Sequence, residues 1–471
     1  MAGGHILVLQ MQRLGDMVMS YPLLLWLSRM FPGQPLWVVG EPAFYRELLP
    51  VSPKAYYVPW TQAASLPVER YECIINLSHR PEAAELAGRL PSREVFGAVA
   101  EPGGITRIRG SWQLYRASIV HNNRHNRFHF AELGALDAVP FEHIAQTRFD
   151  PPRRLTAAEN PIGIFLGASQ EEKRPKPEFW AELATELAKR GHKPILFGGP
   201  AEADFGARVN ALSRLGMTDL CGKTTLAQLI AVMGGLSLLI TPDTGPMHLA
   251  AWTGAPTLNL SMGPVNPWET GPYQPGHHVL RPLLSCRGCW QCRRRAPACR
   301  DAFEPKTVAL LARELARRGE LAAAKVRTPG LALYQTGRGE NGLYALHALG
   351  PARGVNASEA LSAFWSAAFP YFFGQSDGRA ARDAFDAFMA AHPNAAAKFR
   401  QTLPVLGARL KQGLASPAGG LTDAFWTHCP PMLRPFAGFA HMLLQNGDYQ
   451  KLAWMECLHL FERLIAACTA T

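Results

Sequence analysis

The chain has 471 residues, of which 48% are hydrophobic and 18% charged, so it can form two or three globular domains and is not a disordered chain. Its formal net charge of +11 favours an anionic partner, such as a nucleotide sugar, a phosphorylated glycolipid or a membrane surface. Nucleic acid is not the expected partner, because the sequence has no basic helix and no basic stretch interleaved with aromatic residues.

The first residues carry no targeting signal. Residues 1–4 include no basic segment, and the apolar run 6–9 is too short for a signal peptide or a membrane span. We therefore expect a cytoplasmic protein. If it associates with a membrane, we expect peripheral attachment to the inner face of a bacterial inner membrane.

The first half of the chain opens with a βαβ pattern. Its predicted elements are strands at 5–9, 36–39 and 73–76 and an apolar helix at about 17–30. Residues 95–150 are rich in Arg, His and Asn and give no clear secondary-structure prediction.

The second half repeats the alternation of strand and helix after a Pro-rich stretch at 150–152. Its predicted elements are strands at 162–166, 195–197, 236–240 and 258–260 and helices at 177–190, 203–215, 226–233 and 247–253. Such alternation in both halves predicts two doubly wound parallel sheets, with a ligand cleft at the carboxyl ends of their strands.

The composition changes at about residue 325. The segment that follows is rich in Ala, Phe and Leu and shows no strand alternation, so it predicts a mostly helical extension. The expected domains are 1–155 and 156–325, both Rossmann-like, and 326–471, which is helical.

The most informative segment is 241–251, Thr-Pro-Asp-Thr-Gly-Pro-Met-His-Leu-Ala-Ala. Asp243 and Thr244 stand where side-chain oxygens cap a helix, and Pro246 suits its first turn. Gly245 allows close approach to a ligand. A strand, a polar turn and a helix N-terminus together predict an anion site, and a carboxylate there can also hold a sugar hydroxyl.

Three charged residues follow other predicted strands. Asp16 follows the first strand without a G-x-G-x-x-G spacing, and it either caps a helix or serves as a general base. Lys173 either neutralises a diphosphate or lies in a solvated loop, and Glu202 either binds a ribose or favours a helix N-terminus. The chain has no Asp-x-Asp motif, which disfavours glycosyltransferases that hold a divalent cation that way.

These motifs resemble, in order and spacing, the lipopolysaccharide heptosyltransferases, glycosyltransferase family 9. The resemblance covers about residues 5–320. The motifs that carry it are Leu14-Gly15-Asp16 with Pro22-Leu23-Leu24, Lys173 before a Pro/Trp helix, Gly198-Gly199-Pro200 with Glu202, and Asp243-Thr244-Gly245-Pro246-Met247-His248. It implies the GT-B fold, two Rossmann-like domains facing a cleft, and inverting transfer of heptose from ADP-heptose without a catalytic metal.

Site residues follow from the same resemblance. Asp16 would be the base, and the donor pocket would contain Ser169, Lys173, Glu202, Asp243, Thr244, Gly245 and His248. Two features depart from the family pattern. One is the tail after about residue 325, and the other is Lys-Arg-Pro-Lys-Pro at 173–177 where the family has Lys-Arg-Trp.

Four cysteines follow a C-x2-C-x2-C-x6-C spacing, Cys286, Cys289, Cys292 and Cys299. An all-thiolate set on one loop predicts a structural zinc or iron ion, and four reduced thiols are the alternative. Clusters in this position recur in family 9, and related protein heptosyltransferases hold iron in one. Cys73, Cys221, Cys429, Cys457 and Cys468 are expected to be ordinary buried residues.

The leading hypothesis is an inverting glycosyltransferase that uses ADP-heptose or a similar nucleotide sugar and a lipopolysaccharide-core or protein acceptor. The alternatives are a non-catalytic nucleotide-sugar or glycan-binding module with a partner-binding helical tail, and an epimerase on the same fold. Candidates for binding an anionic acceptor, or equally solvated charges, are Arg107, Arg109, Arg116, His121 and Arg124.

Overall fold

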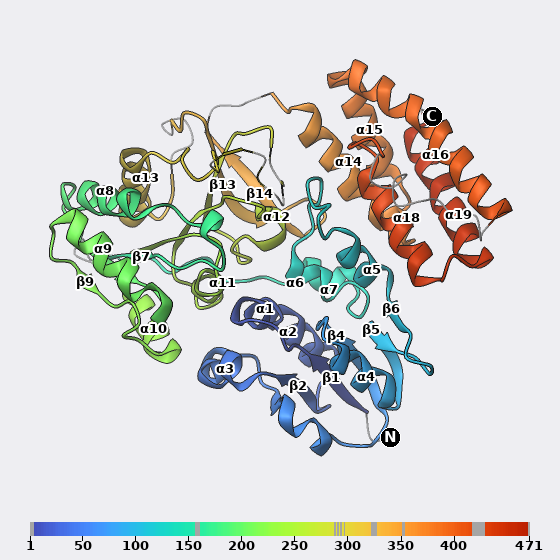
Figure 1. The fold of residues 1–471 in the computed structure, drawn as a ribbon, viewed down its shortest axis with the longest axis horizontal. Helices are drawn as coiled ribbons and strands as arrows, with labels where there is room; N and C mark the ends of the chain where they lie inside the picture. Colours follow the sequence, from blue (N-terminus) through green and yellow to red (C-terminus); the bar gives the residue numbers. More distant parts are fainter. Residues whose placement is uncertain are drawn as a thin grey trace.

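The computed structural model describes residues 4–155, 161–286, 289, 292, 294, 295, 297–321, 327–350, 354–416 and 429–469. Two α/β units face each other, and a bundle of helices from the C-terminal region packs beside the first unit (Figure 1). The fold expected from the sequence, two Rossmann-like units with a helical C-terminal region, is confirmed.

The first sheet has the order β3-β2-β1-β4-β5-β6, and all its neighbours are parallel except β5 and β6. Its strands are β1 (His5–Leu9), β2 (Leu36–Gly40), β3 (Tyr56–Pro59), β4 (Tyr71–Asn76), β5 (Ser92–Ala100) and β6 (Thr106–Arg109). On β1, Ile6 and Val8 join one hydrophobic cluster while Leu7 and Leu9 join another. Alternate residues of a strand point to opposite faces, so both faces of this sheet are covered by helices.

Helices surround this first sheet. They are α1 (Leu14–Met19), α2 (Tyr21–Met30), α3 (Pro42–Tyr45), α4 (Pro81–Arg89), α5 (Ser111–Ser118), α6 (Phe130–Leu133) and α7 (Phe141–Gln146), with 3-10 turns η1 (Arg46–Val51) and η2 (Trp60–Ser65). The single helix predicted for residues 17–30 is divided at Ser20. Pro22 has no backbone N–H to continue the helical hydrogen bonds there.

The second sheet has the order β14-β13-β12-β11-β10-β7-β8-β9. Its strands are β7 (Ile162–Phe165), β8 (Pro194–Phe197), β9 (Thr218–Asp219), β10 (Leu238–Thr241), β11 (Thr257–Leu260), β12 (His278–Pro282), β13 (Leu331–Arg338) and β14 (Tyr344–Leu349). The helical elements around it are η3 (Glu171–Lys173), α8 (Pro177–Ala188), η4 (Pro200–Glu202), α9 (Ala203–Ser213), α10 (Leu226–Met233), α11 (Gly245–Trp252), α12 (Pro267–Thr270) and α13 (Pro305–Arg318).

The structure corrects the expectation that no strand follows residue 325. β13 pairs antiparallel with β12, and β14 pairs antiparallel with β13, so residues 331–349 extend the second sheet. The hairpin turns at Asn341-Gly342, where Gly342 has φ +73°. A glycine adopts this conformation without strain, which favours a tight turn.

The C-terminal helices are α14 (Ala357–Phe372), α15 (Arg379–Ala391), α16 (Pro393–Ala415), α18 (Arg434–Asn446) and α19 (Lys451–Cys468). They pack directly on the first unit. Trp112 of α5 contacts Phe373 edge to face and donates from Nε1 to Oε1 of Gln375 at 2.9 Å. The Asn446 amide exchanges hydrogen bonds with the backbone N and O of Ile108, so α18 covers the open edge of β6.

In the part of the chain that the structure describes, no helix is long and apolar enough to cross a membrane.

Candidate active site

A cleft of about 1620 Å³ lies between the two α/β units at the carboxyl ends of their strands. Its first wall includes Asp16, just after β1, and its second wall is formed by the loops after β7, β8 and β10. The predicted catalytic and donor-binding residues all line it: Asp16, Ser169, Lys173, Glu202, Asp243, Thr244, Gly245 and His248. This is the location expected for ligands on doubly wound sheets.

The two units approach each other closely at two glycines. A Cβ atom on Gly15 would lie 3.4 Å from Cα of Gly245, and a Cβ atom on Gly245 would lie 3.2 Å from the backbone N of Gly15 and 3.0 Å from a methyl carbon of Leu14. The absence of side chains at both positions lets α1 and α11 meet, and this contact brings Asp16 and the 243–248 turn into one cleft.

Asp16 stands at the third position of α1. Its Oδ2 accepts a hydrogen bond from the backbone N–H of Arg13 at 3.3 Å, so the side chain does cap the start of the helix. The carboxylate also lines the cleft and interacts electrostatically with Arg116, whose guanidinium is buried. The local cap therefore fixes the carboxylate in place at the cleft wall, which suits a general base.

Asp243 is the buried carboxyl of the opposite wall. Its side chain is 12% exposed, and burial raises its pKa to about 6. The Oδ2 atom accepts a hydrogen bond from Oγ1 of Thr270 at 3.2 Å, whereas buried Oδ1 has no hydrogen-bond partner among the described residues. A buried acceptor without a partner is costly, so this oxygen is suited to a hydroxyl of a bound ligand.

Two further buried groups flank Asp243. His248 Nε2 lies 3.8 Å from Oδ1, but burial lowers the pKa of His248 to about 4, so the imidazole is neutral at pH 7 and the two do not form an ion pair. Burial raises the pKa of Glu269 to about 8, and the negative charge of Asp243 contributes to this rise. Glu269 is therefore largely protonated at pH 7 and leaves Asp243 as the carboxylate facing the cleft.

The second wall also provides positive charge for an anion. Thr244 caps α11 by accepting a hydrogen bond from the backbone N–H of Met247, as the sequence predicts, and the free N-terminus of this helix faces the cleft. Lys173 of η3 lines the same wall. A lysine and a helix N-terminus together attract a diphosphate.

Glu202 is held by its own turn. Its Oε2 accepts a hydrogen bond from the backbone N–H of Gly199 at 2.9 Å, and Arg174 lies 3.6 Å from its Oε1. Glu202 therefore caps η4, which is one of its two expected roles, and it also lines the cleft, where ribose binding stays a prediction.

Comparisons with known proteins agree with this site. A family model for glycosyltransferase family 9 (heptosyltransferase) matches residues 63–297. Lipooligosaccharide heptosyltransferase 2 of Haemophilus ducreyi is 26% identical over 314 residues, which are 59% of this chain and 88% of that protein. This chain belongs to glycosyltransferase family 9. It is therefore a glycosyltransferase, as the motifs imply.

Two solved structures share the fold. The family 9 glycosyl transferase from Veillonella parvula DSM 2008 matches with a TM-score of 0.52 and 20% identity, covering 67% of this chain and 98% of that one. The ADP-heptose LPS heptosyltransferase II of E. coli matches with a TM-score of 0.50 and 21% identity, covering 67% and 100%. These matches show the GT-B architecture of the family 9 enzyme described here.

The five predicted acceptor-binding residues of this family 9 enzyme do not form one group. Arg107 contacts Asp448, the carbonyl of Asn446 and Glu101, so it joins the first unit to α18. Arg109 pairs with Glu101 at 3.3 Å. Both arginines lie on β6 and neither is among the residues that line the cleft.

Of the other three acceptor candidates, Arg116 and Arg124 lie nearer the junction of the two units. Arg116 donates to the carbonyl O of Leu77 at 3.3 Å and lies near Asp16. His121 is exposed, with φ +58°. Arg124 donates to the carbonyl O of Ser285 at 3.2 Å and lines a second pocket.

The four cysteines of the predicted metal site come together around one pocket of about 380 Å³. Burial raises the pKa of the Cys289 thiol, and the nearby charges of the other three thiols raise it further. The Cys299 sulfur also accepts a hydrogen bond from the backbone N–H of Gly263 at 3.3 Å. As the described side chains stand, no three His, Cys, Asp or Glu residues form a metal-binding group.

The cleft also contains residues that the sequence did not single out. Thr270 binds Asp243, and Phe130, Thr225 and Leu226 line the same space. Thr270 lies on α12, which follows β11. Because ligands bind beyond the carboxyl ends of strands, the segment after this predicted strand could have been searched for further cleft residues. Phe130 comes from a segment whose secondary structure could not be predicted.

Proposed function

We propose that this family 9 enzyme transfers a heptose from ADP-heptose to an acceptor hydroxyl, with inversion at the anomeric carbon and with Asp16 as the general base. The observation that carries this proposal is the arrangement of two carboxyl groups on opposite walls of one cleft. Asp16 is positioned by its helix cap, and Asp243 presents a buried oxygen without a partner. The names of the relatives, which are heptosyltransferases, support heptose as the sugar.

The donor half of the proposed reaction uses the second wall. Lys173 and the N-terminus of α11 hold the ADP diphosphate and stabilise the negative charge that it gains as it leaves. The Asp243 carboxylate accepts a hydrogen bond from a hydroxyl of the donor through Oδ1. Gly245 leaves room for the diphosphate beside the helix start.

The acceptor half of the reaction uses Asp16. As the acceptor oxygen attacks the anomeric carbon, Asp16 takes its proton, and the bond from that carbon to the diphosphate oxygen breaks on the opposite side. The products are the inverted glycoside and ADP.

The acceptor in this proposal is a lipopolysaccharide-core saccharide or a protein side chain, reached from the cytoplasmic side where nucleotide sugars are available. Incubating the protein with ADP-heptose and bacterial lipid or protein extracts, followed by mass spectrometry, tests it. A mass increase of one heptose on an acceptor supports transfer. Saturable ADP-heptose binding without any transfer or hydrolysis would instead indicate the non-catalytic binding module.

The cysteine loop is proposed to hold one structural zinc or iron ion through Cys286, Cys289, Cys292 and Cys299. The four thiols surround one pocket, and thiolates are ligands that both metals accept. An ion there would fix the loop beside Gly263 and Lys173, and no catalytic step passes through it. Elemental analysis of protein purified without added metal is the test, and folded, active protein with less than about a tenth of an equivalent of zinc plus iron would refute it.

A further inference from the structure

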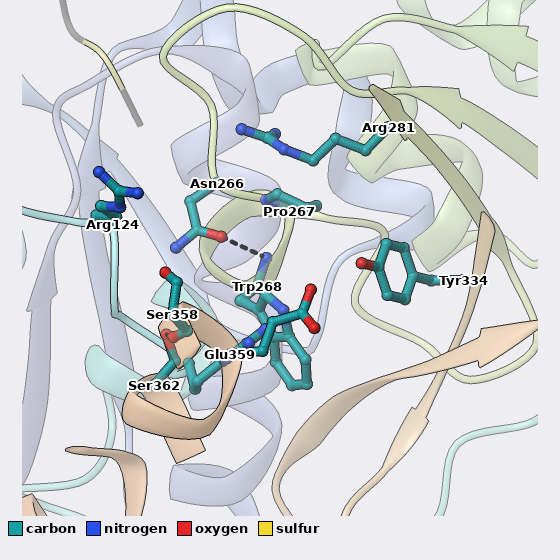
Figure 2. Close-up of a pocket in the computed structure, with 10 residues that line it drawn as sticks. Arg124, Asn266, Pro267, Trp268, Arg281, Tyr334, Ser358, Glu359 and Ser362 are labelled. Atoms are coloured by element: carbon teal, nitrogen blue, oxygen red, sulfur yellow. Dashed lines mark hydrogen bonds between the residues drawn. The ribbon is translucent and has the colours of Figure 1, made fainter. Parts of the chain in front are cut away.

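A second pocket lies where three parts of the chain meet. It shares no lining residue with the active-site cleft, whereas Arg281 lines both this pocket and the cysteine pocket. The first unit contributes Arg124 and Arg127, the second contributes Arg281 and Tyr334, and α14 contributes Ser358 and Glu359 (Figure 2).

Three arginines and one glutamate line this pocket, so the charged side chains around it carry a net positive charge. Each arginine is held by a neighbour. Arg281, 7% exposed, donates to Oγ of Ser261 at 2.7 Å, and the Arg127 guanidinium lies 4.2 Å from the ring centre of Trp268. Arg281 is buried and Arg127 is half-buried, so solvent screens the charges of these two arginines less than that of the exposed Arg124.

The start of α14 adds to the positive charge at the pocket. The helix has 16 residues and begins at Ala357, and Asn356 caps it by accepting a hydrogen bond from the Glu359 backbone N–H at 3.0 Å. The positive end of its dipole therefore lies at the pocket, together with the Ser358 hydroxyl. The Tyr334 hydroxyl points into the same space and provides another donor (Figure 2).

One helical turn separates this pocket from the active-site cleft. Thr270, at the end of α12, lines the cleft, whereas Pro267 and Trp268, at its start, line the pocket. Arg281 lies near the carboxyl end of β12, so the pocket lies at the edge of the second sheet where the strands end, as the cleft does. A large molecule bound at Asp16 can therefore extend past α12 toward the pocket.

We propose that this pocket binds a phosphate or carboxylate group carried by the acceptor, so that the helical C-terminal region selects an anionic acceptor. The inference rests on the proposed transfer reaction for its biological meaning, because the anion must belong to the molecule that supplies the hydroxyl. The binding event itself requires only the arginines and the start of α14.

The test uses the full chain saturated with ADP, so that the diphosphate site is filled. Calorimetric titrations with inorganic phosphate and with D-glucuronate compare the two anion types. We expect saturable binding of at least one of them, weakened at least tenfold in the Arg124→Gln/Arg127→Gln variant. The matched control is Arg93→Gln, which removes an exposed arginine of β5 paired with Glu72 and should bind as the wild type does.

A variant that is expected to change anion affinity in the opposite direction strengthens the test. Glu359→Gln removes the carboxylate from the pocket, so anion binding should become tighter. This variant also decides the question if the double arginine variant does not fold. No saturable binding of either anion, equal binding by the double variant, or weaker binding by Glu359→Gln would each overturn the inference.

Failure of the inference and failure of the proposed function give different results. ADP affinity and slow hydrolysis of ADP-heptose by water report on the cleft alone. If the pocket binds no anion while these two activities persist, only the inference is wrong. If anions bind the pocket but ADP-heptose is neither bound nor turned over, the proposed function is wrong and the pocket is an independent anion site.

Discussion

The Glu132 carboxylate accepts a hydrogen bond from the Arg338 guanidinium at 2.7 Å, although the two residues are 206 positions apart. Glu132 is completely buried on α6 of the first unit, and Arg338 lies on β13 of the added hairpin. The same carboxylate accepts hydrogen bonds from the hydroxyl of Tyr273 at 3.0 Å and the backbone N–H of Tyr344 at 2.7 Å. This network joins the hairpin and both α/β units at one point.

The first prediction concerns this ion pair. Arg338→Met should destabilise the protein strongly, because Glu132 would remain buried without its positive partner, and such losses cost about 3–5 kcal/mol. The midpoint of thermal unfolding should fall clearly, and the Glu132→Gln/Arg338→Met variant should recover part of the loss. Arg208→Met, which breaks an exposed pair with Glu178, should leave the midpoint nearly unchanged. An equal effect of the two single variants would contradict the role of the network.

The second prediction concerns the base. Asp16→Ala should lower turnover by about 10²- to 10⁴-fold, the usual contribution of a positioned general base. ADP affinity should persist, since the diphosphate site lies on the other wall. Steady-state kinetics and calorimetry measure the two effects separately. Near-normal turnover in the variant would show that Asp16 only caps α1.

The third prediction concerns the diphosphate. Lys173→Ala should weaken ADP affinity, and the difference from the wild type should be larger at low salt, where charges are less screened. Lys189→Ala is the matched control, because Lys189 follows the end of α8, is 65% exposed and pairs with Glu186 of that helix. Equal ADP affinity of both variants, in folded protein, would exclude Lys173 from the site.

Local sequence signals predicted much of the fold and the donor wall. The strands at β1, β7 and β8 and the turn before α11 have apolar runs followed by polar or glycine-containing turns, and such signals are contained within a dozen residues. The hairpin 331–349 also had a local signal, Asn341-Gly342 between alternating segments, which the Ala- and Phe-rich composition around it obscured.

Other features depended on contacts between distant segments. Arg107 is a surface cation by sequence, yet its partners Asn446 and Asp448 lie on a region more than 300 residues away. No periodicity or spacing encodes such a contact. For the same reason, the pocket around Arg124 and Arg281 could be found only after the fold had brought the two residues together.

The last prediction follows from the buried state of Asp243. Burial raises its pKa to about 6 from an ordinary value of 3.8, so the folded protein holds this proton more tightly than the unfolded chain. Between those values the unfolded chain loses its proton first, and folding stability falls as the pH rises, by a total of about 3 kcal/mol for a difference of this size. Above about pH 6 the free energy of unfolding is lowered by this full amount.

Asp243→Asn removes this cost, because an amide does not ionise. The variant should therefore unfold at a higher temperature than the wild type at pH 7, and the difference should become small near pH 4 and vanish below it. Its ADP-heptose affinity should fall, since the carboxylate of a residue that lines the cleft is lost. Glu269, whose pKa is raised from 4.5 to about 8, adds its own pH dependence over the same range in both proteins, so the measured quantity is the difference between variant and wild type from pH 4 to 7. A variant that is less stable at pH 7 and binds the donor normally would show that Asp243 serves the fold through Thr270 rather than the ligand.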